Sequence, residues 1–321
     1  MAEPDAVIDW LLDSDPAIRW QVMRDLLDEP EWEWMAERAR VEAQGWGAEL
    51  LAHEDADGQW AGGAFVPANF EPREWEEVGQ PWTATTFSLS MLREFGLDPS
   101  SARARRAVEL IGVNSRWDHD GQPYWEGEVE ECINGRTVAD GAYFGVDVEP
   151  IVERLLGERQ PDGGWNCERC NRSVRSSFAS TINVLEGLLQ FERATGGTPA
   201  SRAARSSGEE FLLERSLFHR LSTGEPADER FLHFLHPNRW RYDILRALDH
   251  FWSAALLTGA PPEPRLAPAV AHVRSRRLDD GTWPLDWTLP GRVWFDVDDG
   301  PGKPSRWVTL RARRVLRWCD Q

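Results

Sequence analysis

The chain has 321 residues and a formal net charge of −18, from 54 acidic and 36 basic side chains. A field of that sign repels phosphates and anionic lipid headgroups, which argues against nucleic acid or an anionic membrane surface as the partner. Hydrophobic residues make up 41% of the chain, and its 18 tryptophans predict either repeated structural anchors or an aromatic-lined pocket.

Helical periodicity is found along the whole chain. Residues 7–28 predict two helices that break at Ser14-Asp15-Pro16, because Asp15 can cap a helix and Pro16 suits a first helical turn. A third helix is expected after Pro30. Further helices are predicted at 83–95, 102–112, 137–157, 176–194, 208–221, 239–257, 266–276 and 305–318. Alternating β-branched patterns are scarce, so the predicted fold class is all-α.

The loop signals between these helices are too short to be domain linkers. We therefore expect one main domain at residues 46–321, with an N-terminal helical extension at 1–45 packed on it. No apolar run approaches the length of a transmembrane helix, and the acidic start lacks the basic head of a signal peptide. Four cysteines are too few for a disulfide scaffold, so a cytoplasmic location is expected. The sequence leaves the oligomeric state open.

One short motif recurs: a helix end, then Asp-Gly, then Trp. Glycine supplies the positive-φ turn that stops a helix, and the tryptophan can pack back across the helix pair. A pair of helices cannot bury its inner face alone, so several pairs must stack. Each Asp or Trp alone would be an ordinary turn residue, but the set indicates repeated helical hairpins. The copies are Asp57-Gly58 with Trp60, Asp120-Gly121 with Trp125, Asp162-Gly163 with Trp165, and Asp280-Gly281 with Trp283.

The segment Gln160-Pro161-Asp162-Gly163-Gly164-Trp165 fits the Gln-x-x-Gly-x-Trp box of terpenoid cyclases. The chain resembles the α/α-toroid superfamily of squalene cyclases and protein prenyltransferases, and more narrowly the bacterial single-toroid proteins called squalene-cyclase-like. Segments 124–145, 162–168, 176–189 and 298–307 carry the narrower resemblance, which covers nearly the whole chain. It implies an α/α toroid, a barrel of helical hairpins around a central cavity.

The segment Asp296-Val297-Asp298-Asp299 matches the Asp-x-Asp-Asp signature of class II terpene cyclases. Neighbouring carboxyl groups in a dry cavity split their pKa values, so that one keeps its proton. The resemblance implies that Asp298 is the acid that protonates an alkene or epoxide, and that Asp296 and Asp299 tune it. The alternatives are a solvated acidic loop and a metal or ligand site.

Cys167 and Cys170 have the Cys-x-x-Cys spacing that suits Zn²⁺, and Cys132 lies on the equivalent loop one repeat earlier. We therefore consider a zinc site at Cys132, Cys167 and Cys170, beside unliganded thiols and a redox dithiol as alternatives. The candidate fourth ligands are His119, His219, His233 and His236.

Two further groups of charged residues could act in a site. Glu126 and Glu128 precede Cys132 and could serve as acid, base or metal ligands if they face a cavity, or could lie in a solvated loop. Arg239, Arg241 and Arg306 adjoin tryptophans and could bind an anionic group, or could be solvated or ion-paired.

Three functional hypotheses remain open. The first is a cyclase or isomerase that protonates an isoprenoid-like or other small apolar molecule. The second is a non-catalytic toroid that binds a ligand or partner, with or without zinc. The third is a metal-dependent enzyme that uses the cysteines with Glu126 or Glu128 as base. The aromatic residues expected to contact the substrate are Trp125, Trp165, Trp294, Trp307 and Tyr143.

Overall fold

The computed structural model describes residues 5–71, 73–169 and 171–321, and over these ranges the fold is all-α, as the sequence predicted. Isolated β-bridges occur in the loops, but the described residues form no β-strand. The helices are α1 (Ala6–Leu12), α2 (Pro16–Asp25), α3 (Glu31–Arg38), α4 (Gly45–Ala52), α5 (Glu74–Val78), α6 (Thr85–Phe95), α7 (Ala102–Asn114), α8 (Glu131–Tyr143), α9 (Glu149–Gly157), α10 (Phe178–Thr195), α11 (Pro199–Leu213), α12 (Ile244–Thr258), α13 (Ala267–Ser275) and α14 (Arg306–Cys319).

Some predicted boundaries were wrong for local reasons. The single helix predicted at 137–157 is two helices, because Gly145 adopts a φ of 79° and the Asp147 carboxylate accepts the Glu149 N–H at 3.0 Å. The helix predicted at 208–221 begins earlier and ends at Leu213, shortly before a left-handed turn. The short helices α4 and α5 were not predicted.

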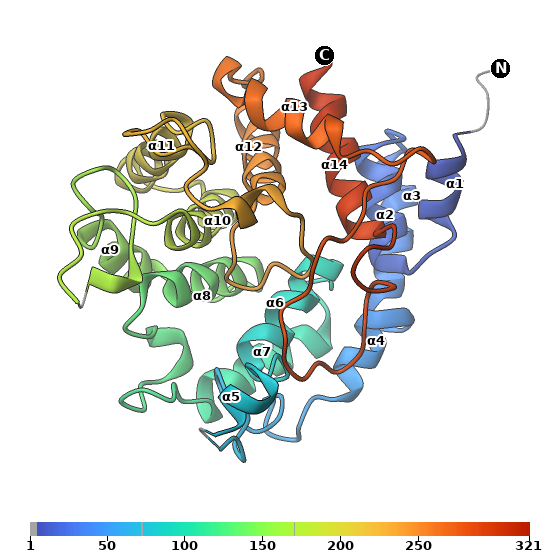
Figure 1. Cartoon of the computed structure of the whole chain (residues 1–321). Coiled ribbons are helices and arrows are strands. Elements are labelled where there is room, and N and C mark those ends of the chain that lie inside the picture. The colour runs from blue at the N-terminus through green and yellow to red at the C-terminus, as the bar shows by residue number, and fades with distance from the viewer. Residues whose placement is uncertain (1–4, 72, 170) are drawn as a thin grey trace.

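Successive helix contacts form a closed circuit. In this circuit α6 contacts α8, α8 contacts α10, α10 contacts α12, α12 contacts α14, α14 contacts α2, and α2 contacts α6 again. Figure 1 shows these six helices following one another in this order round the molecule. A second layer packs outside them, with α3 on α2, α4 on α6, α9 on α8, α11 on α10 and α13 on α12 and α14.

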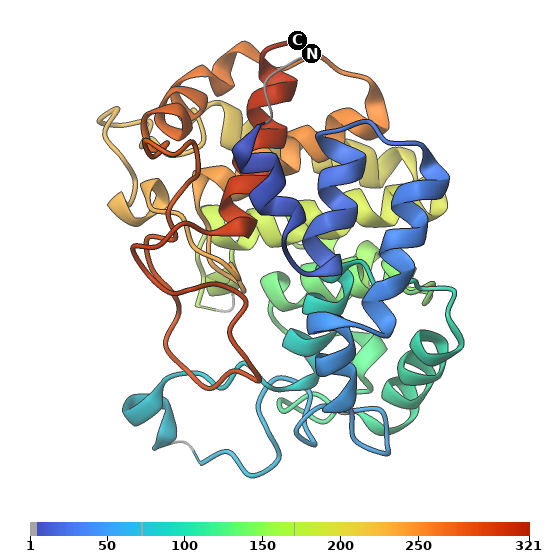
Figure 2. The same ribbon diagram turned by 90° about the vertical axis from the view of Figure 1, so that its right-hand side faces the viewer.

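The N-terminal segment belongs to this circuit, because α2 lies between α14 and α6. Figure 2 shows α1 and α2 beside α14. Val7 and Ile18 share a core cluster with Trp60, Phe95 and Trp307. The apolar core therefore runs across residue 45, and the division of the chain at that residue stays a prediction.

The repeated Asp-Gly-Trp turn has a shared hydrogen-bond pattern. The indole N–H of Trp60 donates to the Leu50 carbonyl at 2.8 Å, that of Trp165 to Leu155 at 2.7 Å, and that of Trp283 to Val273 at 2.7 Å. Each acceptor lies ten residues earlier, near the end of the preceding outer helix.

The backbone N–H of the same three tryptophans donates to a threonine hydroxyl at the start of the next inner helix. The acceptors are Thr85 of α6, Thr181 of α10 and Thr309 of α14, at 2.9–3.1 Å. Each of these turns therefore links an outer helix to its inner helix through one tryptophan. The copy at Trp125 departs from this pattern, since its indole donates to the Val108 carbonyl seventeen residues earlier.

Helices α8 and α10 pack closely through glycine. A Cβ atom on Gly135 would lie 2.5 Å from the Asn183 carbonyl oxygen, and one on Gly187 would lie 2.3 Å from the Gly135 carbonyl oxygen. These contacts exclude any side chain at the crossing. They also fix the directions of the neighbouring charged residues Arg136 and Glu186, which both point into the interior of the circuit.

We expect Trp165→Phe to lower the free energy of unfolding by about 1–3 kcal/mol, because it leaves the buried Leu155 carbonyl without its donor and replaces the indole by a smaller aromatic ring. Urea unfolding measures the change. Trp32→Phe is the control, since Trp32 is 71% exposed and a surface change costs within about 0.5 kcal/mol. Equal stabilities for the two variants would contradict a structural role for the indole N–H.

Candidate functional site

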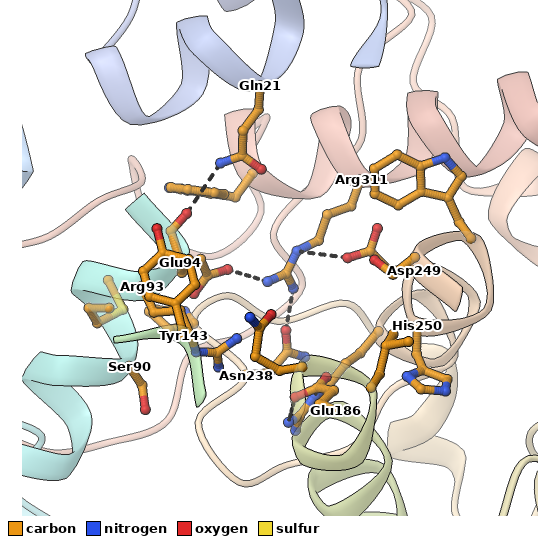
Figure 3. Close-up of a pocket in the computed structure, with 18 of the residues that line it drawn as sticks. Gln21, Ser90, Arg93, Glu94, Tyr143, Glu186, Asn238, Asp249, His250 and Arg311 are labelled. Carbon is orange, nitrogen blue, oxygen red and sulfur yellow. Dashed lines mark hydrogen bonds and ion pairs between the residues drawn. The ribbon is translucent and has the colours of Figure 1, made fainter. Parts of the chain in front are cut away.

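The six inner helices enclose a central cavity of about 300 Å³. Its walls are charged, and the dominant side chain is arginine, even though the chain as a whole is strongly acidic. Figure 3 shows Arg93 and Glu94 of α6, Glu186 of α10, Asp249 of α12 and Arg311 of α14 converging on this cavity. The arginines that line it are Arg24, Arg38, Arg93, Arg136, Arg193, Arg239, Arg246, Arg311 and Arg314.

Five of these arginines are neutralised by carboxylates. The pairs are Arg24 with Asp25, Arg93 with Asp140, Arg246 with Glu186, Arg311 with Glu94, and Arg314 with Asp249 and Asp25. Each such pair places an opposite charge beside a buried guanidinium, which without that partner would lower the free energy of unfolding.

The pKa values of two cavity carboxyl groups reflect this pairing. Burial alone would raise the pKa of Glu186, but Arg246, which donates to both of its oxygens at 2.7 Å, lowers it to about 2. Burial likewise opposes ionisation of Glu94, yet Arg311 and His236 hold its pKa well below the usual range. Both carboxyl groups are therefore ionised at neutral pH.

Four cavity arginines form no ion pair with any carboxylate of the described residues: Arg38, Arg136, Arg193 and Arg239. Arg38 donates to the Gly96 carbonyl and to the Tyr143 hydroxyl, both at 2.8 Å, and Arg193 donates to the Ser253 carbonyl at 2.5 Å. Arg193 is exposed at the cavity's rim, whereas Arg136 and Arg239 are each only 8% exposed.

Arg136 and Arg239 form the most unusual part of the site. The Arg136 guanidinium donates to the Arg239 carbonyl, and its Nε is buried without a partner among the described residues. The Arg239 side chain makes no hydrogen bond or ion pair within the described ranges, and its guanidinium lies 5.4 Å from the Trp82 ring centre. Burial, with the charge of Arg136, lowers the pKa of Arg239 to about 9. Neither cation has an ion-pair partner among the described residues: Asp140 and Glu186 attract Arg136, and Glu94 attracts Arg239, only at longer range.

The backbone of Arg239 is also strained. Its φ is 53°, a left-handed value that arginine rarely adopts. Strain of this kind costs about 1–3 kcal/mol and is found most often at functional sites. Of the three arginines that the sequence associated with anion binding, Arg239 lines the cavity, while Arg241 packs over Trp240 and Arg306 over Trp10.

A second cavity, of about 610 Å³, adjoins the first. Met91, Pro237 and Arg239 line both cavities, so these residues form the wall between them. The carboxylates of Asp296, Asp298 and Asp299 line the second cavity. Its other lining side chains are mostly apolar: Trp82, Met91, Leu285, Leu289, Val293, Phe295 and Val297.

Of the three aspartate side chains in this motif, only that of Asp298 is buried. Its side chain is 6% exposed, and Oδ2 lies 3.4 Å from Nδ1 of His236, whereas Asp296 and Asp299 are exposed. Nε2 of His236 lies 3.2 Å from Glu94 in the central cavity, and the imidazole stacks on Trp307 at 4.7 Å. His236 therefore lies between a carboxyl group of the second cavity, that of Asp298, and one of the central cavity, that of Glu94.

A third group joins Cys132 and Cys167 with Glu130, as the sequence predicted for the two cysteines. The three ligand atoms lie within 4.8 Å of one another and could hold a metal ion. Cys170 lies outside the described residues, and none of the predicted histidines belongs to this group in the part of the chain that the structure describes. The cysteine group does not line either cavity that contains the arginines or Asp298.

The remaining predicted residues are spread over the molecule. Trp307 and Tyr143 line the central cavity, and Trp125 lines a separate groove together with Tyr143. Trp165 is 0% exposed in the core, and Trp294 stacks on His53 at 4.1 Å; neither lines one of the two cavities.

The two predicted glutamates also lie outside both cavities. Glu126 is exposed, and Glu128 is buried where it accepts the Glu130 N–H at 2.7 Å. Burial raises the pKa of Glu128.

The sequence reasoning missed most of the charged cavity residues, including Arg136, Glu186, Arg193 and Asp249. The available signal was charge placed on the inner helices beside small or apolar residues, as in Asn134-Gly135-Arg136-Thr137 of α8. Charges on helices normally indicate a solvated face, and only the closed circuit makes that face internal.

No helix in the described ranges is both long and apolar enough to cross a membrane. No protein-family model and no curated protein matches the chain. Among solved structures, the chain is similar to "Crystal structure of a protein from Actinoplanes", with a TM-score of 0.47 and 17% sequence identity over 99% of this chain and 100% of that one.

Proposed function

We propose that the chain binds a small anionic molecule in its central cavity, within a single α/α toroid. The observation that carries this proposal is the pair Arg136 and Arg239, buried, facing the cavity and unmatched by any described carboxylate. The closed circuit of inner helices supports the toroid. Among the hypotheses from the sequence, the ligand-binding toroid agrees best with this geometry.

The energetics favour an anion as the missing partner. A buried guanidinium without an ion-pair partner costs several kcal/mol, and here two lie together, one of them on the strained backbone of Arg239. A phosphate or carboxylate would accept charge-assisted hydrogen bonds from both, and arginine is suited to bind such groups with two parallel bonds. The charged walls of the central cavity disfavour an apolar ligand there, because it would strip water from the ion pairs.

We expect inorganic pyrophosphate, used as a probe, to bind the wild-type protein in a calorimetric titration. Arg239→Gln should weaken binding by at least about tenfold, or 1.4 kcal/mol. It should also raise the free energy of unfolding of the ligand-free protein, because it removes a buried charge that has no carboxylate partner.

Arg241→Gln is the matched control, since Arg241 lies two residues further along the same loop and lines neither cavity. Absence of pyrophosphate binding in the wild type, or equal affinity in the two variants, would contradict the proposed function.

A second candidate function is supported by the second cavity. We propose that Asp298 acts there as a general acid on an apolar, isoprenoid-like substrate. Three features support it: Asp298 is the buried member of the acidic motif, His236 lies against it, and Trp82 and Phe295 offer aromatic faces that can stabilise a carbocation.

Asp298→Asn should abolish conversion of squalene, used as probe substrate, and leave the thermal unfolding temperature nearly unchanged, because the amide keeps the shape of the side chain but not its acidity. Product is measured by gas chromatography, with Asp279→Asn as the control in an exposed turn outside both cavities. Unchanged turnover in Asp298→Asn, or no product from the wild type, would remove this candidate.

We further propose that Glu130, Cys132 and Cys167 bind zinc. The Cys167 sulfur already accepts two hydrogen bonds, from the Cys132 N–H at 3.2 Å and from the Ser180 hydroxyl at 3.3 Å, and these contacts hold it beside Cys132. Cys167 and burial raise the pKa of Cys132, and a divalent cation between the two sulfurs would reverse that effect. Three protein ligands leave one position open, as in catalytic zinc sites, so the metal-dependent enzyme stays a proposal.

Elemental analysis of the purified protein should find about one zinc per chain. Cys167→Ser should lose the metal because it removes one thiolate ligand, while Cys319→Ser, on α14, should retain it. Less than about a tenth of an equivalent in the wild type would exclude zinc at this group.

A further inference from the structure

The unbalanced positive charge of the central cavity is divided between two places. Arg136 and Arg239, which we name the inner cluster, lie near the start of α8 and in the loop before α12. Arg24, Arg38 and Arg193, the outer cluster, lie at the opposite end. Arg24 and Arg193 occupy the last turns of α2 and α10, and Arg38 bonds to the carbonyl that follows α6.

The outer cluster is itself crowded with cations. The guanidinium groups of Arg24 and Arg38 lie 4.6 Å and 5.5 Å from the ring centre of Trp20, and Asp25 is the carboxylate paired with Arg24. Arg314 forms an ion pair with the same Asp25 carboxylate. This cluster therefore holds more positive charge than its described carboxylate can neutralise, and the exposed Arg193 places it at the cavity's mouth.

The spacing of the two clusters follows from one helix. Arg136 and Tyr143 lie seven residues apart on α8 and both line the cavity. At 1.5 Å per residue this separation is about 10 Å along the helix axis. The Tyr143 hydroxyl accepts a hydrogen bond from Arg38, so the α8 positions beside the inner and the outer cluster lie about 10 Å apart along the helix axis.

The wall between the clusters is polar rather than apolar. It carries Gln190, Asn238 and the paired carboxylates of Glu94, Glu186 and Asp249. Between the two clusters, these carboxylates would repel an anionic group of a ligand, but they accept hydrogen bonds from its hydroxyl groups. If the middle of the ligand were apolar, it would displace water from these polar groups without replacing the hydrogen bonds that the water makes. Trp252 and Trp307 add flat surfaces against which a ring can pack.

Resting on the proposed function, we infer that the ligand of the central cavity is a hydroxylated molecule with an anionic group at each end, of the sugar-bisphosphate class. One end binds the inner cluster and the other binds the outer cluster. Its hydroxyls face Gln190 and the carboxylates between them. The cavity of about 300 Å³ matches a small ligand of this kind.

The test is a calorimetric titration of the full-length protein with fructose bisphosphate, which carries a phosphate on each terminal carbon. Fructose monophosphate and hexanediol bisphosphate serve as comparisons that lack one phosphate or the hydroxyls. We expect the sugar bisphosphate to bind at least about tenfold more tightly than either.

The variants Arg193→Gln and Arg239→Gln each remove one end of the site. Both should reduce affinity for the bisphosphate to about that of the monophosphate, and Arg241→Gln should not change it. Binding of pyrophosphate to Arg193→Gln should persist, since this short probe needs only the inner cluster.

Equal affinity of the wild type for the three compounds, with pyrophosphate still bound, would overturn this inference and leave the proposed function intact. The inference would also be overturned, and the proposed function left intact, if Arg193→Gln still bound the sugar bisphosphate as much more tightly than the comparison compounds as the wild type does. Loss of all binding, pyrophosphate included, would instead reject the proposed function.

Discussion

The fold depends on a tryptophan whose two N–H groups bind different helices. In three of the repeated turns, the indole donates to the outer helix and the backbone N–H donates to a threonine at the start of the inner helix. With its N–H groups paired, such a tryptophan can be fully buried, as Trp165 is. Each such turn ties the start of an inner helix to the end of the outer helix that precedes it in the chain. The side of the inner helix that faces away from the outer layer then points to the centre of the circuit.

That centre is not an apolar core. Because the inner helices turn charged residues inward, most of the arginines there need carboxylate partners, and the pairs with Glu94, Glu186, Asp140 and Asp249 supply them. Breaking one such pair leaves an uncompensated buried charge, which costs about 3–5 kcal/mol. Of the four cavity arginines without a carboxylate partner among the described residues, Arg136 and Arg239 are the two that are buried, and proteins concentrate such costs at binding sites.

The sequence predicted those features that arise from local patterns. The all-α class follows from helical periodicity, and the approach of Cys132 to Cys167 follows from their equivalent positions in successive turns. Other features depend on which segments the ring brings together. Neither the pairing of His236 with Asp298 nor the convergence of arginines from seven helices and the loop before α12 has a local signal. An arginine on a helix is read as solvated until the circuit is known to close.

The two cavities have opposite charge, and this bears on how their proposed activities relate. Arginines dominate the central cavity, and aspartates line the second, with Arg239 in the wall between them. An anion held by Arg239 would meet repulsion from Asp296 and Asp299 if it moved into the second cavity. An apolar substrate suited to the second cavity would lose hydration energy if it entered the first. The two sites therefore select different ligands, and a change at Arg239 should affect anion binding first.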